Sequence, residues 1–88
     1  MVELIGKGDV CAILPGNWDI AVEAAERVGC ITLPRVGEVM TKEEARLFGE
    51  ALVWGLHADD GLIKADRCAR NEIEHIIDYC NSGGFRVE

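Results

Sequence analysis

This chain lacks a long apolar run, an internal repeat, a low-complexity segment and any stretch with linker composition. The apolar run at residues 10–14 is far shorter than the ~20 residues of a membrane-spanning helix. No basic segment precedes an apolar stretch at the start, as a signal peptide would require. We therefore expect one domain over residues 1–88, located in the cytoplasm.

Paired metal-ligand spacings are also missing. The chain has four cysteines and two histidines, which are Cys11, Cys30, Cys68, Cys80, His57 and His75. None forms a C-x-x-C or H-x₃₋₅-H pair of the kind that binds zinc. Reduced cysteines usually behave as small apolar residues. We expect no metal, no cofactor and no catalytic cysteine–histidine pair, which favours a protein that is not an enzyme.

Basic residues are few, with 9 Lys and Arg against 16 Asp and Glu, so the net charge is -7. This balance argues against direct binding to nucleic acid or to an anionic membrane surface. It is compatible with a basic protein partner. Two motifs resemble ligand loops, but residues 6–9 lack the phosphate-loop spacing and residues 59–61 lack the calcium-loop spacing. We interpret both as turns.

Short apolar runs predict the strands. Residues 2–5 and 10–14 flank a glycine-containing turn and predict a β-hairpin, with the unbroken second run as the more central strand. Residues 30–33 predict a third strand, and residues 38–40 a brief extended segment. Residues 85–87 alternate, so they predict either a last edge strand or a frayed tail.

Apolar periodicity predicts three helices, over residues 18–28, 42–57 and 62–80. Asn17 suits the N-cap of the first helix. Thr41 and Glu44 match a capping box at the start of the second. The third carries an amphipathic stripe, and a short turn joins it to the second, so these two helices should form an antiparallel pair.

The predicted fold class is α+β, with element order ββαβ(β)ααβ. We expect a small two-layer sandwich in which a mixed sheet of three to five short strands is covered by the helices.

The helix over residues 42–57 is the most informative element. Apolar residues cover more than half of its circumference, so two sides should be buried, and we place Trp54 in the core. If Leu47, Trp54 or Leu56 stays uncovered, the exposed strip predicts a dimer or partner interface. Gly49 and Gly55 indicate either tolerated weak points or the close approach of another backbone.

The candidate partner-binding residues are one tryptophan in a first helical turn and carboxylates without an obvious cation nearby: Trp18, Asp19, Glu23, Glu26, Asp59, Asp60, Glu72, Glu74 and Asp78. A partly exposed tryptophan near acidic residues would suit a contact hot spot. Packing of Trp18 in the core is the other interpretation. Two acidic groups brought together would form an anionic docking surface.

The sequence therefore favours a small acidic protein-interaction module. In a sharper form it is an inhibitor or adaptor, of the kind carried by phages and mobile elements, that binds a basic surface of a nucleic-acid-handling protein. The alternative is a small homo-oligomeric enzyme or ligand-binding domain with a pocket between protomers. A third interpretation is a structural subunit of a larger complex, and the apolar content leaves room for a homodimer.

Overall fold

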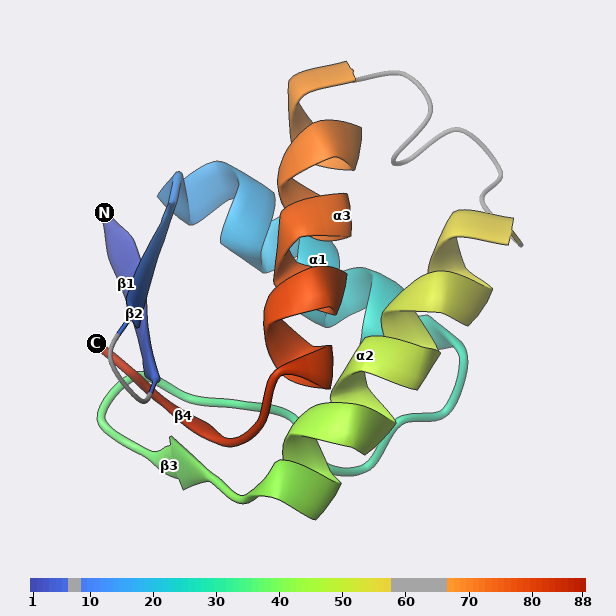
Figure 1. Ribbon diagram of the computed structural model, residues 1–88. Coiled ribbons are helices and arrows are strands. Elements are labelled where there is room, and N and C mark those ends of the chain that lie inside the picture. Colours follow the sequence, from blue (N-terminus) through green and yellow to red (C-terminus); the bar gives the residue numbers. More distant parts are fainter. Residues whose placement is uncertain (7–8, 58–66) are drawn as a thin grey trace.

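A computed structural model describes residues 1–6, 9–57 and 67–88 of the chain (Figure 1). Within these residues, a four-stranded antiparallel sheet and three helices make up the small α+β fold that the sequence predicts. The strands are β1 (Val2–Gly6), β2 (Asp9–Ile13), β3 (Val39–Met40) and β4 (Phe85–Val87). The helices are α1 (Pro15–Arg27), α2 (Lys42–His57) and α3 (Arg67–Asn81).

The strands lie in the order β2-β1-β4-β3, and every neighbouring pair is antiparallel. The predicted hairpin of β1 and β2 is present, with Leu4 opposite Cys11. The expectation of a mixed sheet is wrong. So is the expectation that the second strand is central, because β2 lies at one edge. The C-terminal segment is a strand, but it lies inside the sheet between β1 and β3 rather than at an edge.

The strand predicted over residues 30–33 does not form. The amide of Cys30 instead donates to the carbonyl of Ala25 at the end of α1, and Ile31 is 96% exposed. A strand needs a neighbour to pair its backbone groups. Residues 37–38 lie beside β4 instead. The amide of Gly37 donates to the carbonyl of Val87, and the amide of Val87 donates to the carbonyl of Glu38.

Helix α1 begins earlier than predicted, at Pro15, with Leu14 as its N-cap residue. Proline suits this position because its missing N–H has no helical partner there in any case. Asn17 is therefore not the N-cap. It lies inside the helix, is buried, and its side-chain amide donates to the sulfur of Cys68 at 3.7 Å.

The capping box predicted for α2 is confirmed. The amide of Thr41 donates to the Glu44 carboxylate at 3.0 Å, and the amide of Glu44 donates to the Thr41 hydroxyl at 3.2 Å. Of the two interpretations of Gly49 and Gly55, the close approach of a neighbouring helix is the one that the structure supports. A Cβ on Gly49 would lie 3.0 Å from Cβ of Cys80 on α3, and one on Gly55 would lie 3.2 Å from Cβ of Ala24 on α1.

Helix α3 buries its predicted stripe, which includes Ala69, Ile73, Ile76 and Cys80. Its predicted start at residues 62–66 lies outside the described residues. In Figure 1, α2 runs upward and α3 runs downward beside it, so the two helices are antiparallel as expected.

One face of the sheet meets the helices and the other is open. The inward residues Leu4, Ile13, Phe85 and Val87 join a core that also holds Phe48 of α2. Figure 1 shows all three helices on one side of the sheet. The alternation of buried and exposed residues along β4 follows from the period of two in a strand.

Candidate interaction surfaces

Trp18 is buried, so of its two interpretations the packing in the core is the one that the structure supports, and its place among the candidate partner-binding residues is wrong. Its side chain is only 5% exposed, and its ring lies 5.9 Å from the ring of Phe48 on α2. The N-terminal extension of α1 to Pro15 places Trp18 one turn into the helix, on the face that packs against α2. Trp18 is a core residue and offers no surface to a partner.

The α1 carboxylates are all exposed. Glu23 forms an ion pair with Arg27 at 3.4 Å, with both side chains about half exposed. Such an i,i+4 pair contributes little stability in water. Asp19 and Glu26 form no ion pair within the described residues. Together with Arg27, Glu23 and Glu26 line a shallow hollow near the end of the helix.

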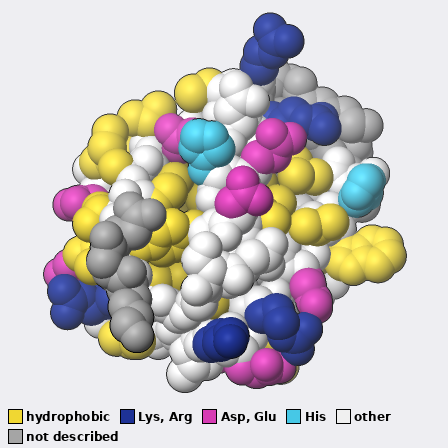
Figure 2. Space-filling model, in the orientation of Figure 1, with side chains coloured by type: hydrophobic (Ala, Val, Ile, Leu, Met, Phe, Trp, Pro, Cys, Tyr) yellow, Lys and Arg dark blue, Asp and Glu magenta, His cyan; other side chains and the backbone are white. Residues whose placement is uncertain are grey.

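The α3 carboxylates differ in the contacts that they form. Glu72 accepts a hydrogen bond of 3.1 Å from the backbone amide of Leu14, at the start of α1. Glu74 pairs with Arg70 at 3.6 Å. Asp78 is exposed, and its side chain forms no ion pair within the described part of the chain. Figure 2 shows acidic side chains gathered with a histidine on the face that α3 presents.

The α1 and α3 carboxylates do not all lie together. Glu72 of α3 contacts Leu14 at the start of α1, whereas Glu26 lies twelve residues farther along α1, or about 18 Å along the helix axis. Asp59 and Asp60 lie outside the described residues. Glu72 and Glu26 therefore belong to different parts of the surface.

Trp54 is 68% exposed, so its expected position in the core is wrong. Leu47 is 40% exposed and Val53 is 39% exposed on the same helix. Figure 2 shows a hydrophobic side chain standing out from the surface at the α2 side of the molecule. Leu47 and Trp54 are therefore uncovered, which is the case in which the sequence predicts a dimer or partner interface on this helix. The seven-residue spacing of Leu47 and Trp54 could have indicated this exposed face from the sequence. It puts both residues on one side of α2, beside Glu43 and Glu50.

We call the outward face of α2 the α2 strip. It consists of Glu43, Arg46, Leu47, Glu50, Val53, Trp54 and His57, all exposed.

An ion cluster occupies the middle of the α2 strip. The Arg46 guanidinium donates to the Glu43 carboxylate at 2.7 Å and to the Glu50 carboxylate at 2.8 Å. The hydrogen bond from Arg46 and its positive charge hold the pKa of Glu43 below its ordinary value. The same contacts raise the pKa of Arg46. Two carboxylates thus fix one guanidinium between the apolar side chains of the strip.

A hollow of about 310 Å³ lies between β2 and α3. Its lining includes Cys11, His75, Asp78, Tyr79 and Ser82. No group of three or more metal-ligating side chains occurs among the described residues. Cys80 lies deeper, where burial and the nearby Cys11 raise the pKa of its thiol to about 12. That thiol stays protonated at neutral pH and is not a nucleophile there.

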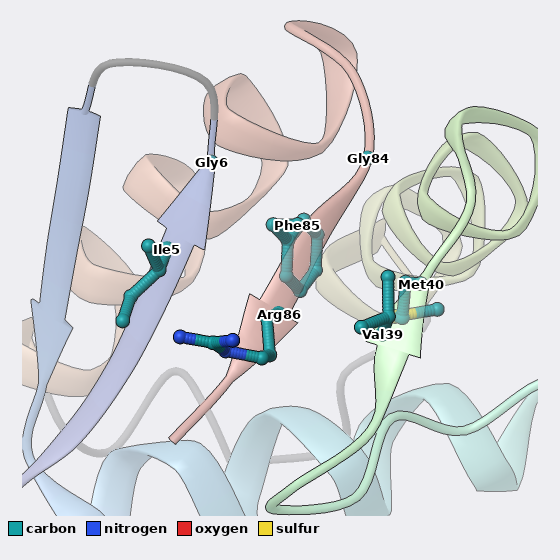
Figure 3. Close-up of a pocket in the computed structure, with 7 residues that line it drawn as sticks. All are labelled: Ile5, Gly6, Val39, Met40, Gly84, Phe85 and Arg86. Carbon is teal, nitrogen blue, oxygen red and sulfur yellow. The ribbon is translucent and has the colours of Figure 1, made fainter.

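Another hollow, of about 460 Å³, opens on the uncovered side of the sheet (Figure 3). Ile5, Arg86 and Val39 lie side by side across β1, β4 and β3. In Figure 3 the Arg86 side chain extends toward β1, where Ile5 lies. Its guanidinium pairs with Glu88 at 3.0 Å. This hollow presents apolar side chains around a cation that is already paired.

Comparisons with known proteins name no relative. No protein-family model matches the chain, and neither a curated protein nor a solved structure is significantly similar to it. Over the described ranges 1–6, 9–57 and 67–88, no helix is both long enough and apolar enough to span a bilayer. The fold and its surfaces are therefore the basis for assigning a function.

Proposed function

We propose that this chain is a non-enzymatic protein-interaction module and that the α2 strip is its main contact surface. The observation that carries the proposal is the exposure of Trp54 and Leu47 on a helix whose other side is in the core. Large apolar side chains are stabilised when a partner removes them from water, and tryptophan is a frequent anchor of protein interfaces.

In its sharper form, the module is an acidic inhibitor or adaptor, of the phage or mobile-element type, acting in the cytoplasm. It would bind a basic surface of a nucleic-acid-handling protein through carboxylates outside α2. The net charge of -7 supports this form. So do the exposed side chains of Asp19, Glu26 and Asp78, which no arginine or lysine neutralises within the described residues. Complementary charge would speed association and select for a basic partner.

The test is cross-linking followed by mass spectrometry in the native cell, at low and at high salt. The carboxylate variant combines Asp19→Asn, Glu26→Gln and Asp78→Asn. We expect it to lose a salt-sensitive link to a basic protein, because the attraction it removes is also screened by salt. The control combines Glu23→Gln and Glu74→Gln, two carboxylates whose charges are already paired, and should retain the link. A partner kept by the carboxylate variant and at high salt contradicts binding through these groups.

The alternative is a small homo-oligomeric enzyme or ligand-binding domain, and one observation favours it. His75, Cys11 and Asp78 all line the hollow between β2 and α3. These side-chain types can exchange protons or attack a substrate when they are aligned. Backbone NMR shifts recorded against a small-molecule library would test this. Shifts centred on Cys11 and His75, and abolished by His75→Ala, favour the alternative over the interaction module.

A further inference from the structure

We propose that the α2 strip is occupied by α2 of a second copy of this chain, packed antiparallel about a two-fold axis at Glu50. The inference rests on the proposed role of the α2 strip as a contact surface. It goes further by naming the occupant. A two-fold interface brings the same surface of both copies together, so each side chain must suit its symmetry partner.

The α2 strip meets this requirement on both sides of Glu50. In an antiparallel pair centred there, a residue a given number of positions before Glu50 faces the residue the same number after it. Leu47 then faces Val53 of the second copy, which joins two apolar side chains. Arg46 faces Trp54 of the second copy, and Glu43 faces His57 of the second copy. The three pairs are thus apolar with apolar, cation with aromatic ring, and carboxylate with imidazole.

The geometry of Arg46 in the single chain already suits this packing. Its guanidinium is fixed by Glu43 at 2.7 Å and by Glu50 at 2.8 Å, and its side chain remains 51% exposed. A guanidinium held by carboxylates can stack its flat face on an indole without giving up those hydrogen bonds. Trp54 is 68% exposed and able to receive it. Because Arg46 is already held in place, it loses little further conformational entropy on association.

The one unfavourable position is the axis itself, where Glu50 meets Glu50 of the second copy. Each of these carboxylates accepts a hydrogen bond from its own Arg46, so the two like charges are locally neutralised. The cluster also explains why an apolar strip carries charge at its centre. If the two-fold axis lay elsewhere along α2, Arg46 would not face the indole of Trp54 of the second copy.

The contact should be weak because one helix face is small. From Glu43 to His57 the α2 strip is about 21 Å long. A single helix pair of this length stays below the roughly 1,200 Å² of total buried area found in stable complexes. We therefore expect a dissociation constant in the micromolar range. The carboxylates of α1 and α3 lie outside this contact, so a dimer would display them twice and bind a repeated basic partner more tightly.

Sedimentation equilibrium of the purified chain over a wide concentration range measures the dimer. We expect reversible self-association that Trp54→Ala weakens at least tenfold, as for an anchor residue. Arg46→Glu places three carboxylates on each strip and should weaken it as strongly. Arg70→Glu makes the same charge change at an exposed, paired arginine on α3 and should leave the dimer unchanged. Circular dichroism verifies that each variant is folded.

Disulfide trapping locates the axis. In a Cys68→Ala background, Glu50→Cys should form a covalent dimer under mild oxidation, since only a residue at the axis meets its own copy. Glu26→Cys, exposed on α1, should stay monomeric. A chain that remains monomeric to about 1 mM, a concentration at which a micromolar dimer is saturated, overturns the inference. A dimer insensitive to Trp54→Ala and not trapped by Glu50→Cys overturns it too. Neither result touches the carboxylate test, which decides the sharper form of the proposed function separately.

Discussion

The carboxylate of Glu72 accepts a hydrogen bond of 3.1 Å from the backbone amide of Leu14, 58 residues earlier in the sequence. Leu14 is the N-cap residue of α1 and has no side-chain cap of its own. A distant residue on α3 therefore supplies the negative group that the start of a helix favours. The contact fixes the start of α1 against α3.

We expect Glu72→Ala to destabilise the fold by about 1 kcal/mol, the usual cost of losing a helix cap. Urea denaturation measures the change through its midpoint. Asp78→Ala is the control, because Asp78 is an exposed carboxylate on the same helix whose side chain forms no hydrogen bond or ion pair within the described residues. Equal losses in the two variants would show that the Leu14 contact contributes nothing.

The close packing of α2 on α3 predicts the effect of a single added methyl group. Gly49→Ala gains about 1 kcal/mol of helix propensity. Its Cβ would, however, lie 3.0 Å from Cβ of Cys80, and overpacking of a core typically costs about 1–3 kcal/mol. We expect a net loss of stability in thermal or urea unfolding. Gly16→Ala in α1 should instead stabilise the chain, because the added Cβ would have no atom of another element within 4 Å.

The Cys80 thiol predicts how stability depends on alkaline pH. Burial and the neighbouring Cys11 raise its pKa from 9.0 to about 12 in the folded chain. Between these two pH values the unfolded state binds fewer protons than the folded state. Stability should therefore fall as pH rises above 9, by at most about 1.4 kcal/mol per pH unit, and below pH 9 this group should have no effect.

Urea unfolding at several pH values between 8 and about 10.5, inside the window set by the shifted thiol, tests this slope against Cys80→Ala. The variant has no thiol to titrate at this position, so its stability should fall less steeply, whatever its absolute value. Parallel pH profiles would mean that the folded-state pKa of Cys80 is not raised.

The two tryptophans should differ in their fluorescence. Trp54→Phe leaves only the buried Trp18, which should emit at shorter wavelength and resist quenching by acrylamide. Trp18→Phe leaves the exposed Trp54, which should emit at longer wavelength and be quenched several-fold more efficiently. The measurement belongs at low concentration, where the proposed dimer has dissociated. Similar quenching of the two variants contradicts the burial difference between them.

The elements set by interactions between near neighbours could be predicted from the sequence. The capping box of Thr41 and Glu44 spans four residues, and the stripe of α3 repeats within two helical turns. The β1–β2 hairpin needs only a short turn between two apolar runs. Such contacts depend on the local chain, so the residue pattern alone predicts them.

Strand order could not be predicted, because it depends on which segments meet. Residues 30–33 have a strand-like composition, but both sides of β4 are occupied by β1 and β3, and residues 30–33 lie outside the sheet. The unbroken apolar run of β2 suggested a central strand. In the fold it lies at an edge, because the chain's last strand enters the sheet on the other side of β1.

The candidate site shows the same division. The sequence determined that α2 carries more apolar surface than one neighbour can cover, and that the chain as a whole is acidic. Only the tertiary structure decided that Trp18 packs against Phe48 while Trp54 remains exposed. The physical reason is that α1 and α3 approach α2 at Gly55 and Gly49, where the absence of a side chain allows close contact. With those two sides covered, the face bearing Trp54 is left outside.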